Sequence, residues 1–233
     1  MPSLDDSLPV IREALTGRYG RPEPFAPADD AFAEIVLALL DRMFDAPKRA
    51  RALEALRDAG LLEPQALAES DPDEVAEALH SAGLKVQEKA LTPLRRVARW
   101  LVELHHGAAD DLVGPAGPVA TGQLREELAA INGVGPATAD ALLLFALRRP
   151  AYPLDRATYR IFARHGWLDA TADYDEARDA VERLAPDDPA ALACLSAWFT
   201  RVGRDYCRLA VAKCDKCPLR PWLPEGGPLD PGA

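Results

Sequence analysis

The stretch Leu128-Ala-Ala-Ile-Asn-Gly-Val-Gly-Pro-Ala-Thr-Ala-Asp-Ala-Leu-Leu143 is the most informative part of the 233-residue chain. It starts with a helical pattern, which the tight turn Asn132-Gly-Val-Gly135 interrupts. Because proline is favoured in the first turn of a helix, Pro136 predicts that a second helix starts directly after the turn. Two glycines one residue apart allow positive φ angles and close backbone approach, so we expect a compact helical hairpin.

A hairpin of this kind offers a site for an anion. The N–H groups at the start of a helix lack intrahelical partners and point outward, where they can bind a phosphate. The residues expected to contact DNA here are Gly133, Val134, Gly135, Ala137 and Thr138. A cation held by the hairpin carbonyls is a second possibility, and a purely structural corner with a glycine turn is a third.

The residues downstream favour the DNA-binding interpretation. Tyr152-Pro-Leu-Asp-Arg-Ala-Thr-Tyr-Arg160 lies about twenty residues after the hairpin. The two segments together resemble the endonuclease III branch of the helix-hairpin-helix DNA glycosylases, from about Ala31 to Leu223. The resemblance implies base excision repair, in which a damaged base is flipped out of duplex DNA and removed. It also makes Asp155 the catalytic aspartate, although this residue is equally suited to cap the helix that follows.

The sequence departs from the family's pattern at two positions. Family members that also cleave the strand use a hairpin lysine as a Schiff-base nucleophile, and Ala137 stands at that position here. The resemblance therefore implies weak or no lyase activity. The glutamine that fills the gap left by the flipped base corresponds to Met43, which could still wedge into the base stack.

The sequence does not decide which damaged base is the substrate. The run Thr138-Ala-Asp-Ala-Leu-Leu-Leu-Phe-Ala146 also resembles a glycosylase branch that removes alkylated purines. An oxidised pyrimidine and an alkylated base are therefore both possible substrates. A protein that binds damaged or bent DNA without turnover is the alternative function.

The four cysteines all lie in the last 40 residues of the chain. In a cytosolic chain such a group favours a metal over disulfides. The spacing Cys207-x6-Cys214-x2-Cys217 matches the first three ligands of the endonuclease III iron–sulfur loop. The resemblance thus implies an iron–sulfur cluster, of the 4Fe-4S type, with a fourth ligand that is not a cysteine.

The fourth ligand has no obvious source. The family's fourth cysteine corresponds to Leu223, and Cys194 lies roughly 20 Å from the loop along one helix, as expected of a buried structural thiol. Glu225 or Asp230 could donate an oxygen. A three-iron cluster, a zinc site and an empty site are further possibilities.

The charge pattern allows a nucleic-acid partner despite a net charge of −10. Residues 84–99, 148–164 and 201–220 form basic segments that could provide a local DNA-binding surface, although ordinary solvated helix faces would look the same. No apolar run reaches the roughly 18 residues that span a bilayer, and the N-terminus lacks a signal-peptide pattern. We therefore expect a cytoplasmic monomer that binds double-stranded DNA and no membrane.

Apolar residues at helical spacing predict an all-α fold. No alternating apolar and polar run predicts a strand. The predicted helices are Ala31–Met43, Glu74–Ala82, Leu91–His105, Gln123–Ala130 with Thr121 as N-cap, Ala137–Leu147, and Pro189–Tyr206.

A loop rich in Gly and Pro at residues 107–118 splits the chain near its midpoint and predicts two lobes with a cleft between them. Residues 1–30 would form a helix and loop that belong to the cluster lobe. Residues 31–147 would form a six-helix barrel that ends in the helix-hairpin-helix, at about 121–147. Residues 148–233 would form the second lobe, which holds the catalytic aspartate and the cysteine loop.

Overall fold

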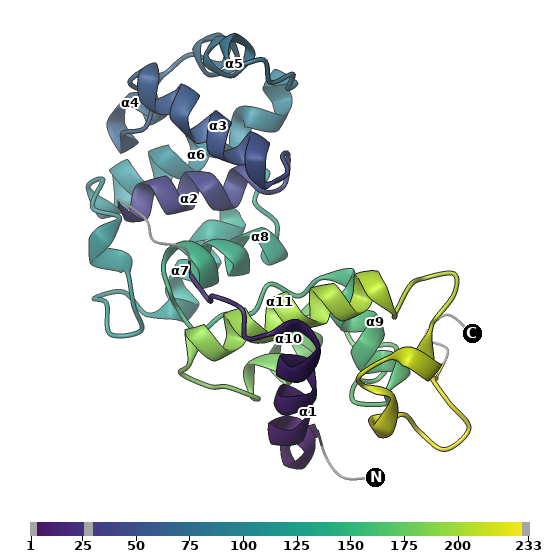
Figure 1. Ribbon diagram of the computed structural model, residues 1–233. Coiled ribbons are helices and arrows are strands. Elements are labelled where there is room, and N and C mark those ends of the chain that lie inside the picture. The colour runs from purple at the N-terminus through teal and green to yellow at the C-terminus, as the bar shows by residue number, and fades with distance from the viewer. Residues whose placement is uncertain (1–3, 26–29, 230–233) are drawn as a thin grey trace. The chain divides into compact units, whose positions relative to one another are not determined.

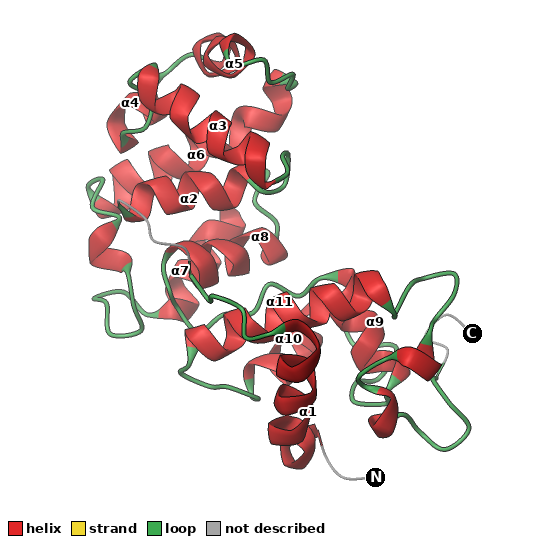
Figure 2. Ribbon diagram, in the orientation of Figure 1, coloured by secondary structure: helices red, strands yellow, loops and turns green. Residues whose placement is uncertain are grey.

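The computed structural model describes residues 4–25 and 30–229, and helices dominate it (Figures 1 and 2). Within these ranges there is no β-strand, only an isolated antiparallel bridge between Cys207 and Ala212. The prediction of an all-α fold is thus confirmed. None of the helices in the described ranges is long and apolar enough to cross a membrane.

The chain divides into two compact units, one formed by Met1–Ala26 with Tyr152–Ala233 and the other by Pro27–Ala151. The helices of the first unit are α1 (Leu4–Tyr19), α9 (Arg156–Arg164), α10 (Tyr174–Glu182) and α11 (Pro189–Asp205), followed by the short 3₁₀ turns η3 (Cys214–Lys216) and η4 (Arg220–Trp222). The helices of the second unit are α2 (Ala31–Leu40), α3 (Ala46–Asp58), α4 (Pro64–Glu69), α5 (Pro72–Ser81), α6 (Glu88–His105), the 3₁₀ turn η1 (Asp110–Leu112), α7 (Thr121–Ala130), α8 (Pro136–Ala141) and the π-helical turn η2 (Leu142–Ala146).

Helix α2 forms the centre of the second unit's core. Its predicted apolar stripe is buried, and the stripe consists of Phe32, Ile35, Val36, Leu39 and Leu40. The helix ends at Leu40 rather than at Met43, because Asp45 already serves as the N-cap of α3 and accepts a hydrogen bond from the Lys48 N–H. The intervening residues form the turn between the two helices.

Two predicted helix boundaries near the hairpin are wrong. Thr121 is the first residue of α7, and Ala120 takes the extended N-cap conformation without a side-chain cap. The helix predicted at 137–147 begins with Pro136 and changes at Leu142 into a π-helical turn, which the bond from the Leu147 N–H to the Leu142 carbonyl closes at 3.0 Å. Periodicity cannot distinguish the two helix types here, because almost every residue of this run is apolar.

The first unit is built around the packing of α9 against α11. Phe162 meets Phe199 edge to face, with ring centroids 5.3 Å apart. Gly203 lets the helices approach closely, since a Cβ at this position would overlap the side chain of Ala157. Helix α1 is joined to α11 through Trp198, whose Nε1 donates to the Gly20 carbonyl at 2.9 Å.

Candidate functional site

The turn of the hairpin, which as a whole spans residues 121–146, contains two glycines with different roles. Gly133 has a φ of +97°, and a Cβ there would lie 3.0 Å from the Cγ of Pro93. The turn conformation therefore favours glycine at this position, and a side chain would also crowd Pro93 of α6. Gly135 has a φ of −82° and a ψ of 170°, so the expectation of a positive φ is wrong for this glycine. A Cβ on Gly135 would meet no atom of the chain within 4 Å.

The start of α8 presents backbone donors. Among the described residues, no acceptor is present for the N–H groups of Gly135 and Ala137, and Pro136 has no N–H. The next two N–H groups, of Thr138 and Ala139, both donate to the Gly135 carbonyl, at 2.9 and 3.0 Å. The hairpin thus combines free donors with open space at Gly135, which is the arrangement that an incoming phosphate requires.

Two arginines from other helices hold the hairpin. Arg96 of α6 donates to the carbonyl of Asn132 in the turn at 2.7 Å. Arg42, which follows α2, donates to the hydroxyl of Thr138 at 2.6 Å. Arg42 was not among the predicted DNA-binding residues, although it directly precedes the predicted wedge, Met43.

The side chains predicted to contact DNA differ in their exposure. Val134 is 3% and Thr138 7% exposed, and their N–H groups already donate to the Ile131 and Gly135 carbonyls. Met43 is partly buried and packs against the hydrophobic core, which leaves only part of its side chain available as a wedge. Ala137 is exposed at the first turn of α8.

A buried ion pair joins the two helices of the hairpin. Arg125 of α7 donates through Nε to the carboxylate of Asp140 on α8 at 2.6 Å. Asp140 is fully buried, whereas the Arg125 side chain is 21% exposed. A buried carboxylate is costly without a partner, so this pair locks α7 and α8 into one arrangement.

Asp155 is held through both of its carboxylate oxygens. Oδ1 accepts a hydrogen bond from the Thr158 N–H at 2.6 Å, so Asp155 is the N-cap of α9, as predicted. Oδ2 accepts from the hydroxyl of Thr200, on α11, at 3.1 Å. Thr200 could not be predicted from sequence patterns, because the contact joins residues 45 positions apart. The carboxylate is part-buried and oriented by neutral donors.

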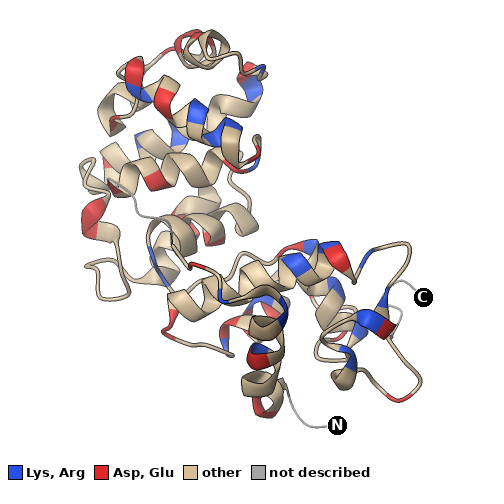
Figure 3. Cartoon of the chain, in the orientation of Figure 1, with Lys and Arg blue, Asp and Glu red and all other residues tan. Residues whose placement is uncertain are grey.

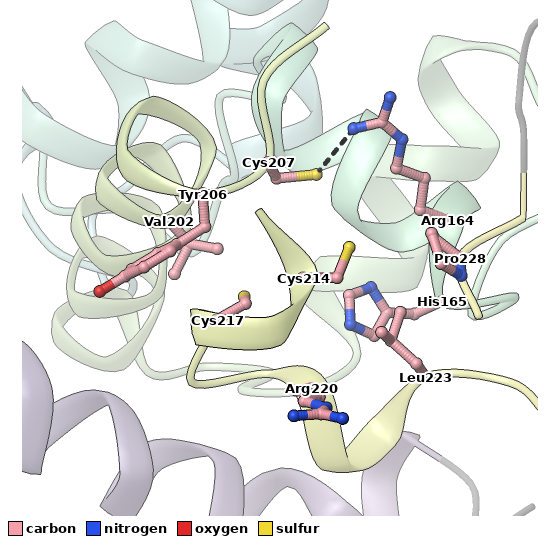
Figure 4. A pocket seen from close by; sticks show the side chains of 10 residues that line it. All are labelled: Arg164, His165, Val202, Tyr206, Cys207, Cys214, Cys217, Arg220, Leu223 and Pro228. Atoms are coloured by element: carbon pink, nitrogen blue, oxygen red, sulfur yellow. Dashed lines mark hydrogen bonds between the residues drawn. The ribbon is translucent and has the colours of Figure 1, made fainter. Parts of the chain in front are cut away.

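The three cysteines with family spacing lie together. One pocket, which we call the cysteine pocket, is lined by Arg164, His165, Val202, Tyr206, Cys207, Cys214, Cys217, Arg220, Leu223 and Pro228 (Figure 4). The bridge between Cys207 and Ala212 closes the loop between the first two cysteines. The fourth cysteine, Cys194, is buried in α11, with Sγ 3.6 Å from the Pro22 carbonyl.

Two arginines of α9 anchor this loop. Arg160 donates to the carbonyl of Cys207 at 2.8 Å. Arg164 donates to the Cys207 Sγ at 3.4 Å and to the Arg208 and Leu209 carbonyls at 2.8 and 3.2 Å.

Not all of the basic segment 148–164 is therefore a surface for DNA. Arg149 is 1% exposed and donates to the carbonyls of Leu112 and Val119, both at 2.8 Å. Arg149, Arg160 and Arg164 of this segment therefore make contacts within the protein. Basic residues also lie at the C-terminal end of α11 and in the loop that follows it (Figure 3). Among these, Arg208, Lys213 and Lys216 line a shallow depression beside Arg18.

The cysteine pocket contains three thiols, the type of donor that holds iron–sulfur clusters. Burial raises the pKa of the Cys217 thiol to about 11, and it also raises the pKa of Cys214, so without a metal both side chains are protonated thiols. In the described ranges, no three His, Cys, Asp or Glu side chains lie close enough to share one metal ion. The ligands of a cluster bind different irons, so they can lie farther apart. Glu225 is exposed and does not line the pocket, and Asp230 lies outside the described residues.

The chain is similar to known DNA glycosylases. No protein-family model matches it. MJ1434 of Methanocaldococcus jannaschii, whose name assigns it to the DNA repair glycosylases, is 30% identical over 213 residues, which cover 90% of this chain and 92% of that protein. Endonuclease III of Thermotoga maritima is 27% identical over 157 residues, 67% of this chain and 66% of the enzyme.

The fold agrees with these relatives. A solved structure of a non-covalent endonuclease III–DNA complex superposes with a TM-score of 0.68 at 16% identity, covering 97% of both chains. The chain therefore belongs to the endonuclease III-like family of DNA repair glycosylases.

Proposed function

We propose that this DNA glycosylase removes its damaged base by hydrolysis, with Asp155 as the catalytic carboxylate, and cleaves the DNA strand weakly or not at all. The observation that carries the proposal is the fixed orientation of Asp155 between the Thr158 N–H and the Thr200 hydroxyl. Cleavage of the base–sugar bond develops positive charge on the sugar. A preoriented carboxylate stabilises that charge without reorganising, and it can activate a water molecule for attack.

The absence of an amine in the hairpin supports hydrolysis without strand cleavage. A Schiff base needs a primary amine beside the sugar, and the methyl group of Ala137 cannot form one. The hairpin contains no lysine at any position. The product would then be an abasic site in an intact strand.

Introducing the missing amine is expected to add lyase chemistry. In Ala137→Lys, borohydride should trap a covalent protein–DNA complex that the unmodified chain forms poorly, because exposed residue 137 lies in the first turn of α8. The measurement is the trapped fraction on a duplex with an abasic site. Thr121→Lys, in the first turn of α7, is the matched control. Equal trapping by both variants would contradict the assignment of position 137.

The hairpin is proposed to bind duplex DNA through the phosphate backbone. Gly135→Asp is expected to lower the affinity for all sequences alike, by about tenfold or more, because the new carboxylate would repel the phosphate. The fold should tolerate the change, since the φ of Gly135 is ordinary and the space beside it is open.

The same change at Gly122 serves as the control for Gly135→Asp. A Cβ at Gly122, in the first turn of α7, also meets nothing within 4 Å. Affinity is measured by fluorescence anisotropy on an undamaged duplex at moderate salt. An affinity that Gly135→Asp leaves unchanged, or that Gly122→Asp lowers equally, would count against the hairpin as the phosphate site.

Thr200 is proposed as a positioning residue for Asp155. Thr200→Val removes the hydroxyl and keeps the shape, so single-turnover base removal should slow about threefold to tenfold. Thr200→Ser keeps a hydroxyl at this position and should restore the rate. Equal slowing in Thr200→Ser and Thr200→Val would indicate a merely structural role.

Cys207, Cys214 and Cys217 are proposed to hold a 4Fe-4S cluster. The cluster, when bound, would cross-link the loop after α11 in the way that structural metal sites stabilise small folds. All four cysteines are free, as expected of a reducing, cytoplasmic environment. The proposed partner is double-stranded DNA with a damaged base, either an oxidised pyrimidine or an alkylated base, bound by a monomer.

Binding of damaged DNA without turnover is the second candidate function. It is favoured by the alanine at position 137 and by the partial burial of Met43, since both family side chains are then missing. Retention of an oriented Asp155 favours catalysis.

A further inference from the structure

Two exposed arginines hold the hairpin, one on each side of its glycine turn in the sequence. Arg96 of α6 donates through Nη1 to the carbonyl of Asn132, directly before the turn glycine Gly133, at 2.7 Å. Arg42, which follows α2, donates through Nη1 to the hydroxyl of Thr138, after the turn, at 2.6 Å. We call Arg42 and Arg96 the turn arginines. All of these residues belong to the unit Pro27–Ala151.

Neither turn arginine forms an ion pair with a carboxylate in residues 4–25 and 30–229. The two acids closest to Arg42 in sequence pair with other cations, Asp41 with Arg49 and Asp45 with Lys48. A guanidinium carries five N–H groups, and the contact with the hairpin uses one of them. Each turn arginine therefore keeps its charge and most of its donors for a bound anion.

The hairpin itself lacks the charge that a phosphate site needs. Residues 121–146 contain one basic residue, Arg125, against the three acids Glu126, Glu127 and Asp140. Arg125 is already bound to the buried carboxylate of Asp140. Since neutralisation of phosphates by Lys and Arg supplies most of the affinity for duplex DNA, the positive charge beside this hairpin has to come from other elements.

We propose that Arg42 and Arg96 each bind one phosphate of the DNA strand held by the hairpin, and that they supply the positive charge that the hairpin lacks. This inference rests on the proposed role of the hairpin in DNA binding. The planar fork of arginine can bind two phosphate oxygens at once. The contact with the hairpin already restrains each guanidinium, so less conformational freedom is lost when the phosphate binds.

The proposal is tested by the salt dependence of DNA binding. Arg42→Gln and Arg96→Gln remove the charge and keep an N–H donor that can reach toward the hairpin. In the full chain, each variant is expected to bind an undamaged duplex about threefold to tenfold more weakly at 0.1 M salt, as estimated for one lost phosphate contact. The plot of log affinity against log salt concentration should become shallower by about one for each variant and by about two for the double variant.

Two sets of controls separate phosphate binding from support of the turn. Arg42→Lys and Arg96→Lys keep the charge and should restore the slope of the unmodified chain. Arg51→Gln removes an exposed charge from α3, and α2 lies between α3 and the hairpin helices (Figure 1). This variant should leave the slope unchanged.

The proposal is overturned if both glutamine variants keep the original slope, if Arg51→Gln lowers it equally, or if the lysine variants fail to restore it. Gly135→Asp is measured in the same assay, so the two hypotheses can fail separately. Weaker binding by Gly135→Asp alone would remove the turn arginines and leave the hairpin as the phosphate site. A lower slope in the glutamine variants alone would support the arginines and remove the contact at Gly135.

Discussion

Asp155→Asn is expected to lower the single-turnover rate of base removal by about 10²- to 10⁴-fold while DNA affinity stays near that of the unmodified chain. Asparagine lacks the negative charge that would stabilise the sugar cation, and it cannot accept a proton from water. It still caps a helix well, so α9 should keep its start at Arg156. The rate is measured with enzyme in excess over a damaged duplex.

Asp188→Asn is the matched control for this effect. Asp188 caps α11 in the same unit, and its Oδ1 accepts from the Ala191 N–H at 2.9 Å, which is the same type of contact. The substitution removes an equivalent charge from an equivalent position, so base removal should stay near normal. Comparable losses in both variants would point to a structural effect, and full activity of Asp155→Asn would remove Asp155 from the mechanism.

Asp140→Ala is expected to destabilise the protein by about 2–3 kcal/mol, because it removes the fully buried carboxylate that accepts from Arg125 across the hairpin. The measurement is the free energy of unfolding from chemical denaturation. Asp175→Ala is the control, since Asp175 pairs with Arg178 at the same 2.6 Å but has a side chain that is 71% exposed. That surface pair should contribute at most about 1 kcal/mol. Similar losses of unfolding free energy in the two variants would contradict the expectation that the buried pair contributes more than the exposed pair.

The parts of the fold that could be predicted from sequence are those that short-range patterns control. The capping role of Asp155 depends on residues within one helical turn, and the apolar stripe of α2 depends on local periodicity. The turn at Gly133 was predicted for the same reason. The π-helical turn after α8 was not, because a wholly apolar run carries no periodic signal.

The side chains that complete the sites come from distant parts of the chain. Thr200 reaches Asp155 across 45 positions, and Arg42 reaches Thr138 across 96. His165 lines the same pocket as the cysteines because α9 packs against α11. Spacing rules cannot show such contacts. Charge patterns alone do not show which basic residues are buried. Arg149 lies in a basic segment but donates to the backbone carbonyls of Leu112 and Val119.

Base removal without strand cleavage is tested most directly by a single-turnover assay of the unmodified chain. The duplexes contain an oxidised pyrimidine, an alkylated purine or no damage. Each product is analysed with and without alkali. We expect base release from at least one damaged duplex, with strand breaks that appear only after alkali, since the hairpin carries Ala137 in place of a lysine. Tight binding to damaged DNA without base release from any duplex would contradict the glycosylase mechanism and support a binding protein. Strand breaks without alkali would contradict the absence of lyase activity.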